Sequence, residues 1–369
     1  RHPRRGEAGA AEVDVRPQRL LAVLVVAAGA ACAVARPDAA ATPPCEFDGA
    51  ARIVAIGDPH GAYDQFLEIM RLAGLVDAKK RWVGGTTHLV QVGDVIDRGA
   101  DSRKILDLLR ALTPQAAAAG GAVHELLGNH EEMRMVGDFR YTSKGEIAAF
   151  ATAGSAALRQ QVSDAASPDK RAGLLEAPLG MIEMVRAFAP DGEYGAYLRR
   201  LPAVVRINGI LFLHGGISPA YASERCSEIN EEVRRDLTED LALTRATLAT
   251  TLVGRPDGPL WYRGLAQEPD TFGSEVNAIL ETEQASAMVV GHTVAPGQRV
   301  TARFGGTVFL IDTGMNPKYV PDGRPSALEI ANGVFTAIYP DGRVVLKPVA
   351  GGGPARDGHL SKGRRGPQR

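Results

Sequence analysis

Five short polar blocks, each placed directly after an apolar run, constrain this chain more than any other feature of its sequence. Each block joins one or more glycines to residue types that bind metal ions. The blocks are Gly57-Asp58-Pro59-His60-Gly61, Gly93-Asp94-Val95-Ile96-Asp97-Arg98-Gly99, Gly128-Asn129-His130-Glu131, His214-Gly215-Gly216 and Gly291-His292-Thr293. Glycine lets the backbone turn sharply and come close to an ion. We therefore expect these blocks to form one site.

The apolar runs before the blocks are typical of buried strands. Strands are predicted at 52–56, 88–92 and 122–127, and an amphipathic helix follows each of the first two. This alternation predicts an α/β fold whose buried strands are covered by helices. Ligands in open α/β sheets collect at the carboxyl ends of strands, so separate strands can bring the five blocks together.

The later part of the chain is also rich in predicted strands. They fall at 204–207, 210–213, 287–290, 308–311, 334–338 and 344–346. We expect them to form a second sheet packed on the first. Residues 132–200 have a mostly helical pattern and are predicted to form an inserted helical cap. The whole folded domain is expected to span 51–349.

The two ends differ from this domain. Residues 1–35 are predicted to be a signal peptide with an upstream lead, because a basic flank precedes an apolar run at 20–35 that ends in Ala33-Val34-Ala35. The run is shorter than the about 20 residues that span a membrane, which favours cleavage over the alternative of a membrane anchor. We expect an exported protein, periplasmic or secreted, with no stable membrane insertion after cleavage. Residues 36–50 are predicted to be a linker, and the Gly-, Arg- and Pro-rich residues 350–369 a disordered tail.

Cysteine content and charge limit the partners. Cys45 and Cys226 would remain after cleavage, and an oxidising compartment permits them to pair; two reduced thiols are the alternative.

A formal net charge of −1 and 5% aromatic residues argue against binding nucleic acid through charge or base stacking. A local cationic pocket for one phosphate stays compatible with that balance. The oligomeric state is not indicated.

The residue types in the blocks fit the hydrolysis of phosphate esters. The negative charge of the ester repels a nucleophile, and two metal cations about 3.5–4 Å apart can neutralise it and activate water. Mixed oxygen and nitrogen ligands suit Mn, Fe or Zn better than Ca. Arginine offers a fork of donors to phosphate oxygens, and a histidine can protonate the leaving oxygen. We therefore expect two divalent or trivalent metal ions as cofactors.

In order and composition the blocks resemble the phosphoprotein phosphatase family within the calcineurin-like metallophosphoesterases. The patterns GDxHG, GDxxDRG, GNHE, HGG and GHT occur in family order over about residues 52–315. The stretches Met133–Tyr141 and Gly258–Gly264 resemble the Shewanella-like protein phosphatase branch. The resemblance implies a calcineurin-like metallophosphoesterase fold, with two packed mixed β-sheets flanked by helices.

The resemblance also implies a role for each block residue. The implied ligands of a first metal ion are Asp58, His60 and Asp94. The implied ligands of a second are Asp94, Asn129, His214 and His292, with Asp94 bridging the two ions. His130 matches the family's general acid and Asp97 the carboxylate that orients it. Arg98 and Arg263 match the phosphate-binding arginines.

The implied activity is hydrolysis of phosphate monoesters, on phosphoproteins or small phosphoesters, with phosphotyrosine preference suggested by the branch. At two places the sequence departs from the family's pattern in a way that bears on this implied activity. Pro59 stands where the family often has Val, in the turn between two ligands. Residues 311–314 (Ile-Asp-Thr-Gly) replace the Ser-Ala-Pro-Asn-Tyr loop of eukaryotic Ser/Thr enzymes and are similar to bacterial relatives that cleave dinucleoside polyphosphates. The alternatives are therefore a dinucleoside polyphosphate or nucleotide hydrolase on the same metal site, and a non-catalytic phosphate-binding module. The presence of every implied ligand, acid and arginine weighs against the module.

Outside the blocks we expect structural roles. His88 and His124 are expected to be packed or solvated rather than metal ligands, and Asp312 to accept a hydrogen bond at a strand end. Buried packing is expected for Met133, Met135, Met181 and Met184. Solvated surface positions are expected for Arg199, Arg200, Arg234 and Arg235.

Overall fold

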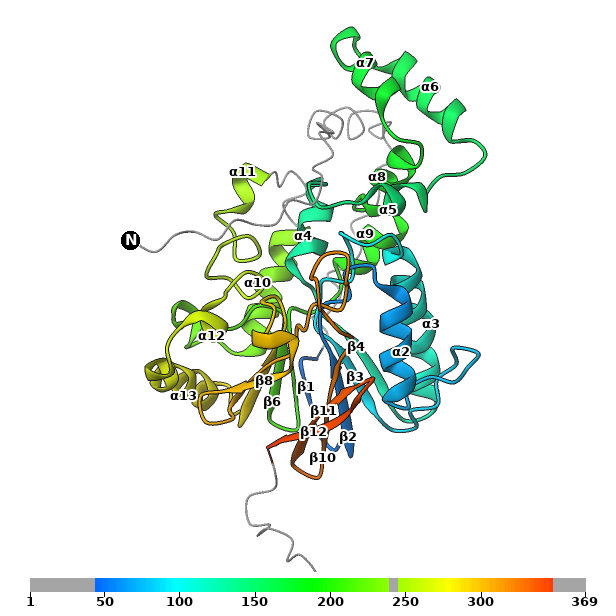
Figure 1. The fold of residues 1–369 in the computed structure, drawn as a ribbon. Coiled ribbons are helices and arrows are strands. Elements are labelled where there is room, and N and C mark those ends of the chain that lie inside the picture. Colours follow the sequence, from blue (N-terminus) through cyan, green and yellow to red (C-terminus); the bar gives the residue numbers. More distant parts are fainter. Residues whose placement is uncertain (1–43, 239–244, 348–369) are drawn as a thin grey trace, which may run out of the picture.

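The computed structural model describes residues 44–238 and 245–347, which form two six-stranded mixed β-sheets flanked by helices (Figure 1). The predicted signal peptide at 1–35 and tail at 350–369 lie outside the described residues. Among the helices of residues 44–238 and 245–347, none combines the length and the apolar character that a membrane span requires.

The first sheet has the strand order β12-β11-β10-β2-β3-β4. Its strands are β2 (Arg52–Ile56), β3 (His88–Gln91), β4 (Ala122–Glu125), β10 (Ala327–Ala331), β11 (Val334–Tyr339) and β12 (Gly342–Lys347). Neighbours among β2, β3 and β4 are parallel, with Ile53 opposite His88 and His88 opposite Ala122. Buried β-branched residues such as Ile53 and Val54 account for the strand at β2.

The second sheet has the order β1-β5-β6-β7-β9-β8. Its strands are β1 (Glu46–Phe47), β5 (Val204–Ile207), β6 (Ile210–Leu213), β7 (Ala287–Val290), β8 (Thr301–Arg303) and β9 (Val308–Leu310). Neighbours among β6, β7 and β9 are parallel. The two sheets pack face to face around one apolar cluster, in which the rings of Phe309 (β9) and Phe335 (β11) stack 4.4 Å apart.

Helices cover the outer faces of both sheets. Beside the first sheet lie α2 (Tyr63–Leu72) and α3 (Ser102–Ala118). In each helix the buried residues recur at helical spacing, as Phe66 and Ile69 do in α2 and Ile105 and Leu109 do in α3. The second half of the chain supplies α10 (Cys226–Thr238), α11 (Arg245–Leu248), α12 (Gly264–Gln267), α13 (Gly273–Thr282) and the 3₁₀ turns η1 (Pro219–Tyr221), η2 (Asp270–Phe272) and η3 (Pro296–Gln298).

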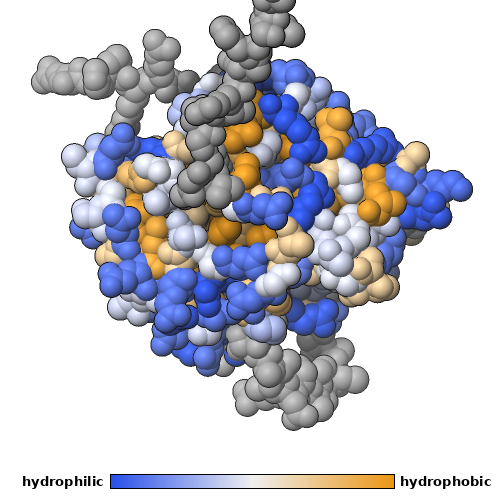
Figure 2. All heavy atoms as spheres, turned by 90° about the horizontal axis from the view of Figure 1, so that it is seen from below, coloured by the Kyte–Doolittle hydropathy of each residue, from blue (hydrophilic) through white to orange (hydrophobic). Residues whose placement is uncertain are grey.

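The cap, defined here as residues 132–200, is helical as expected. It contains α5 (Lys144–Ala148), α6 (Ser155–Ala165), α7 (Pro168–Glu176), α8 (Met181–Phe188), α9 (Glu193–Leu198) and most of α4 (Asn129–Met135). In Figure 1, α6 and α7 lie farthest from the sheets. The four methionines expected to be buried are all buried. Viewed from the end opposite the cap, the surface is mainly hydrophilic with small hydrophobic patches (Figure 2).

Three sequence-based expectations need correction. The predicted strands at 334–338 and 344–346 join the first sheet rather than the second, because β10 pairs antiparallel with β2 and the following hairpins continue outward from it. The predicted linker at 36–50 contains β1, a two-residue strand too short to show a periodicity, which pairs with β5. Arg199 is only 8% exposed, since its guanidinium donates to backbone carbonyls such as Gly195 O and Leu237 O.

The structure also shows how the two cysteines and the two histidines near β1 are arranged. Cys45 and Cys226 form a disulfide that ties the start of β1 to α10. His88 and His124 are packed: their ring nitrogens lie 3.1 Å apart, and the ring of Phe47 lies 4.5 Å from that of His124.

Candidate metal centre

The strand-end blocks turn inward through an uncommon backbone conformation. Five of the predicted site residues have positive φ angles: His60 (43°), Asp94 (55°), Asp97 (69°), Arg98 (64°) and His292 (65°). Residues other than glycine rarely adopt this left-handed region, and such strain clusters at functional sites. Each turn lets a strand end abruptly and aims the next side chain at the shared edge of the sheets.

Glycines allow two of these blocks to approach each other closely. A side chain at Gly93 would meet the backbone of Gly128, and one at Gly128 would meet Asp94. The second and third blocks are therefore in backbone contact, which only residues without a Cβ allow.

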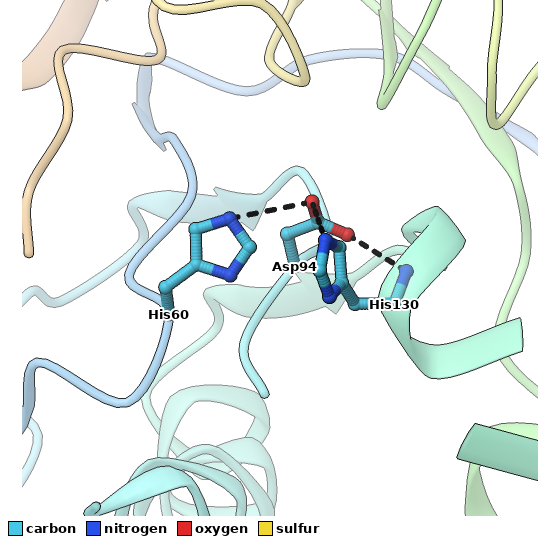
Figure 3. A group of neighbouring side chains, drawn as sticks. All are labelled: His60, Asp94 and His130. Carbon is cyan, nitrogen blue, oxygen red and sulfur yellow. Dashed lines mark hydrogen bonds and ion pairs between the residues drawn. The ribbon is translucent and has the colours of Figure 1, made fainter. Parts of the chain in front are cut away.

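Asp94 lies at the centre of the site. Its Oδ2 atom is 3.6 Å from Nε2 of His60, 3.8 Å from Nε2 of His130 and 3.3 Å from Nε2 of His214. Figure 3 shows His60 and His130 on two sides of Asp94, with dashed lines marking their contacts. The carboxylate is buried, and burial raises its pKa, but His214 and His130 outweigh this and hold the pKa of Asp94 well below its usual value.

Hydrogen bonds at the far side of each ring leave one imidazole nitrogen free for a metal ion. Nδ1 of His60 lies 3.0 Å from Ile96 O, and Nδ1 of His214 lies 2.9 Å from Val92 O. Each Nδ1–H therefore donates to a carbonyl, and each Nε2 carries the lone pair that faces Asp94. In His292 the roles are reversed, since Nε2 donates to Trp261 O at 3.1 Å.

Two of these histidines, His60 and His292, are held in the neutral form that binds metals. Burial lowers the pKa of His60 to about 3, and burial together with His214 and Arg263 lowers the pKa of His292 well below its usual value. A neutral imidazole with one nitrogen already donating is the ligand state that metal sites use.

Within the part of the chain that the structure describes, several buried hydrogen-bond acceptors at the site have no donor to pair with. Bound cations would supply the missing partner for these atoms. Oδ1 of Asn129 lies 2.9 Å from Nε2 of His214, although the latter nitrogen carries no proton in the tautomer above. Asp58 accepts from the backbone N–H of His292 through Oδ2, and its buried Oδ1 has no hydrogen-bond partner among the described residues. One ion bound beside Asp58 and another bound by Asn129 and His214 would satisfy these atoms.

Excess negative charge supports the same interpretation. Burial, and after it the neighbouring carboxylates of Asp312 and Asp94, raises the pKa of Asp58 well above its usual value. Burial also raises the pKa of Asp312 to about 6. Bound cations would offset this repulsion, so the donor set fits two metal ions.

The histidine and carboxylate groups fall into two sets around the shared Asp94. One set contains His60, Asp94 and His130, and the other contains Asp94, His214 and His292. Asp58 and Asn129, also predicted as ligands, lie beside these sets through their contacts with His292 and His214. Asp312 accepts a hydrogen bond from Gly314 N, as expected of a strand-end acceptor.

His130 and Asp97 form a buried pair. Nδ1 of His130 lies 2.7 Å from Oδ2 of Asp97, so Nε2 is the nitrogen that faces the centre. Burial lowers the pKa of His130, but Asp94 and Asp97 outweigh it, and the pKa lies above its usual value. The arrangement is that of a histidine oriented by a carboxylate to give up a proton.

The two predicted phosphate arginines sit at the rim of the site. The guanidinium of Arg98 lies between two tyrosine rings, 3.5 Å from that of Tyr319 and 4.6 Å from that of Tyr141. Arg263 is exposed and donates through Nη1 to His292 O at 2.8 Å and to Thr293 Oγ1 at 3.0 Å.

Sequence reasoning gave no role to several residues that shape the site. Glu131 is buried, and its carboxylate accepts from the backbone N–H groups of Gly128, Asp94 and Val95, each at 2.9 Å. A glutamate three residues after a helix N-cap is a signal that could have found it. Arg134 and Tyr141, which lie in the stretch 133–141 that resembles the Shewanella-like branch, also contact predicted site residues, although the sequence assigned them no role. Tyr319 and Glu146 make such contacts too and lie in no motif.

Comparisons with known proteins agree with the geometry. Residues 51–296 match the family model for calcineurin-like phosphoesterases. The chain is 31% identical over 306 residues to Shewanella-like protein phosphatase 2 of Arabidopsis thaliana. This match covers 77% of this chain and 76% of that protein. It is 29% identical over 269 residues to Shewanella-like protein phosphatase 1 of Plasmodium berghei, with 72% and 67% covered. The crystal structure of a cold-active protein-tyrosine phosphatase from a psychrophilic Shewanella species superposes with a TM-score of 0.65 at 28% identity, covering 82% of each chain.

Proposed function

Since this chain belongs to the calcineurin-like phosphoesterase family and is related to the Shewanella-like protein phosphatases, we propose that it is a metal-dependent phosphatase that hydrolyses phosphate monoesters. The observation that carries this proposal is the convergence of three histidine nitrogens, from three separate strand ends, within 3.8 Å of one Asp94 oxygen. Histidine nitrogens gathered in this way around one shared carboxylate suit a two-metal hydrolase.

The residues would divide between two ions. Asp58, His60 and Asp94 would hold the first. Asp94, Asn129, His214 and His292 would hold the second. Bound there, two ions of Mn, Fe or Zn would supply Lewis acidity, charge neutralisation for the phosphate and activation of water.

The chain's own residues would perform the remaining steps. Arg98 and Arg263 would bind the phosphate oxygens and orient the ester, because a guanidinium offers paired donors in one plane. His130 would hold its proton on Nε2 and transfer it to the leaving oxygen. Asp97 would keep Nδ1–H in place, so that the ring presents the correct nitrogen.

We propose phosphorylated proteins, including phosphotyrosine proteins, as the substrate class. The names of the Arabidopsis and Shewanella relatives support this proposal. The exposed rings of Tyr141 and Tyr319 beside Arg98 support it too, since they offer apolar surface next to the phosphate site.

A metal-dependence experiment tests the activity. The purified protein is expected to contain two metal ions per chain, to lose activity on p-nitrophenyl phosphate after chelation, and to regain it with Mn. A panel of phosphotyrosine peptide, phosphoserine peptide and diadenosine tetraphosphate then identifies the substrate class. Full activity after exhaustive chelation would refute the proposal, and a clear preference for diadenosine tetraphosphate would replace the substrate class.

We also propose that the protein is exported and cleaved near Ala35. The disulfide between Cys45 and Cys226 supports an oxidising compartment. Mass spectrometry of the native mature protein tests this, with a non-reducing peptide map for the disulfide. An intact 20–35 segment in the membrane fraction would instead indicate an anchor.

A further inference from the structure

Arg134, in helix α4 of the cap, is a fully buried arginine beside the proposed general acid. Its Nη2 atom donates to Oδ1 of Asp97 at 2.5 Å, to Oγ1 of Thr142 at 2.8 Å and to Oε1 of Glu146 at 3.2 Å. The side chains of Arg134, Asp97 and Glu146 are each 0% exposed. One nitrogen of the guanidinium therefore joins two buried carboxylates.

The rest of the guanidinium lies in apolar surroundings. The rings of Phe139 and Phe188 lie 5.3 Å and 5.0 Å from its central carbon, and Nη1 lies 3.4 Å from the sulfur of Met184. Removing such a charge from water is so costly that a buried ion pair often adds nothing to stability compared with apolar side chains. Fold stability alone therefore gives no reason for charges here.

The contact with Arg134 completes the hydrogen bonding of Asp97. Oδ1 of Asp97 accepts from Arg134 and, at 2.9 Å, from Thr142, while Oδ2 is bonded to Nδ1 of His130. With both oxygens engaged on opposite sides, the carboxylate cannot rotate away from the histidine. Its orientation sets which nitrogen of His130 faces the centre.

Glu146 accepts from the same nitrogen of Arg134 as Asp97 does. It lies in α5, and its Oε1 also accepts from the backbone N–H of Asp97 at 3.3 Å. Burial lowers the pKa of Arg134, but Glu146 and Asp97 outweigh it, so the guanidinium stays charged. The cap thus contacts both the side chain and the backbone of the loop that carries Asp97.

We propose that Arg134 is a positioning residue: clamped by Glu146, it holds Asp97, and through Asp97 it holds His130 in the orientation that donates a proton to the leaving oxygen. The inference rests on the proposed phosphatase function and assigns the cap a part in catalysis beyond covering the site.

The test compares two leaving groups in the full-length, Mn-loaded protein, under conditions in which chemistry limits the rate. Loss of a general acid matters most for a poor leaving group. Arg134→Met is therefore expected to lower kcat on a phosphoserine peptide by about 10²-fold, within the range for general acid catalysis, and on p-nitrophenyl phosphate by less than about tenfold. KM should change little, because Arg134 does not reach the substrate. Arg134→Lys keeps the charge and one nitrogen donor on a differently shaped side chain, so it should recover part of the loss.

Arg199→Met is the matched control. It also removes a buried cap guanidinium, but the partners of Arg199 within residues 44–238 and 245–347 are backbone carbonyls. It is expected to lower the melting temperature without changing the ratio of the two activities. The double variant Arg134→Met/His130→Asn should be no slower on the phosphoserine peptide than His130→Asn alone, since both changes act on one proton transfer.

The outcomes separate the two proposals. If the wild type has no metal-dependent activity on p-nitrophenyl phosphate, the proposed function fails. If the wild type is active but Arg134→Met lowers both activities equally, as a general loss of structure would, the positioning role is wrong. Additive losses in the double variant would refute it as well. Should Arg134→Met not fold, Glu146→Gln gives the same test, with the same change in activity ratio expected and an unchanged ratio refuting the role.

Discussion

The strand-end ligands and the helical cap contribute to the same site in different ways. Asp58, His60, Asp94 and their partners follow parallel strands, and the sheet edges determine where they lie. The cap side chains Arg134, Tyr141 and Glu146 reach the site from helices and a loop packed over it. The first group supplies atoms suited to bind ions, and the second surrounds the groups that handle the proton and the phosphate.

This difference shows two kinds of constraint. Metal coordination demands particular donor atoms, so a change of residue type at the strand ends is expected to remove the chemistry. Positioning demands only that a neighbour be held, which several packing arrangements can achieve. Substitutions should therefore have graded effects, largest at the metal ligands and smaller in the cap and at the rim.

The largest effect is expected at Asp94, the one side chain proposed to touch both ions. Asp94→Asn keeps the shape but removes the charge, so both ions should bind weakly. Charge stabilisation by bound metals is worth several kcal/mol, so activity should fall at least about 10³-fold. Metal content by mass spectrometry and turnover of p-nitrophenyl phosphate measure this. Asp77→Asn, which removes a surface carboxylate paired with Arg81, is the control and should keep both ions. Two bound ions with normal turnover in Asp94→Asn would contradict the bridging role.

Much of the fold follows from the sequence because buried parallel strands carry an unmistakable pattern. The runs at 52–56, 204–207, 210–213 and 287–290 are β2, β5, β6 and β7 with the predicted bounds. The assignment of β11 and β12 to a sheet could not be predicted, because it depends on β10, whose pairing with β2 is a long-range contact. Short strands such as β1 and β8 carry too few residues for a periodicity.

The site shows the same limit. Residues in the glycine-flanked blocks were identifiable because coordination chemistry restricts their type and the backbone restricts their spacing. No sequence pattern assigns a partner to Arg134 or to Arg199, yet Arg134 faces two carboxylates and Arg199 faces carbonyls. Only the tertiary packing of α4, α5 and α9 distinguishes these two arginines.

The next largest effect is expected at His130, where the ligand region meets the cap. His130→Asn removes the proton donor, which contributes about 10²–10⁴-fold when the leaving group is poor. Turnover of a phosphoserine peptide should fall by that amount. The loss on p-nitrophenyl phosphate should be much smaller, because its leaving group needs no proton. Equal losses on both substrates, with chemistry limiting the rate, would leave His130 as a positioning residue or a metal ligand only.

Arg263 should show the opposite pattern to His130. It lies on the strand side of the site, bonded to the backbone of His292, and is proposed to contact phosphate oxygens common to all substrates. Arg263→Ala removes one charged donor, which is worth about 10²-fold in rate. The loss should be similar on the phosphoserine peptide and on p-nitrophenyl phosphate, in KM, kcat or both. A loss confined to one leaving group would contradict this role.

The smallest effects are expected at the two tyrosines around Arg98, one from each region. Tyr319, in the loop between β9 and β10, stacks on Arg98 and is 41% exposed. Tyr319→Leu removes the cation–π contact that helps to hold Arg98 in place. Such a contact at an exposed site is worth about 0.5–1 kcal/mol, so kcat/KM should fall about two- to fivefold. Because Arg98 binds phosphate, this loss in kcat/KM should be the same for phosphotyrosine and phosphoserine peptides.

Tyr141, the cap tyrosine, should instead discriminate between these peptides. Tyr141 is 40% exposed, and its ring lies 5.2 Å from the ring of His130, the proposed proton donor to the leaving group. A phosphotyrosine ring leaving there could stack on Tyr141, and an aromatic pair is worth about 0.5–1.5 kcal/mol, whereas a serine side chain gains nothing comparable. Tyr141→Leu should therefore lower kcat/KM about two- to tenfold more on the phosphotyrosine peptide than on the phosphoserine peptide.

Tyr141→Phe is the control and should behave as wild type, because the ring is kept and the hydrogen bond from Arg98 N goes to the backbone oxygen of residue 141. If Tyr141→Leu and Tyr319→Leu lower both substrates equally, the cap supports the proton donor but does not select the leaving group, and specificity must come from elsewhere on the rim.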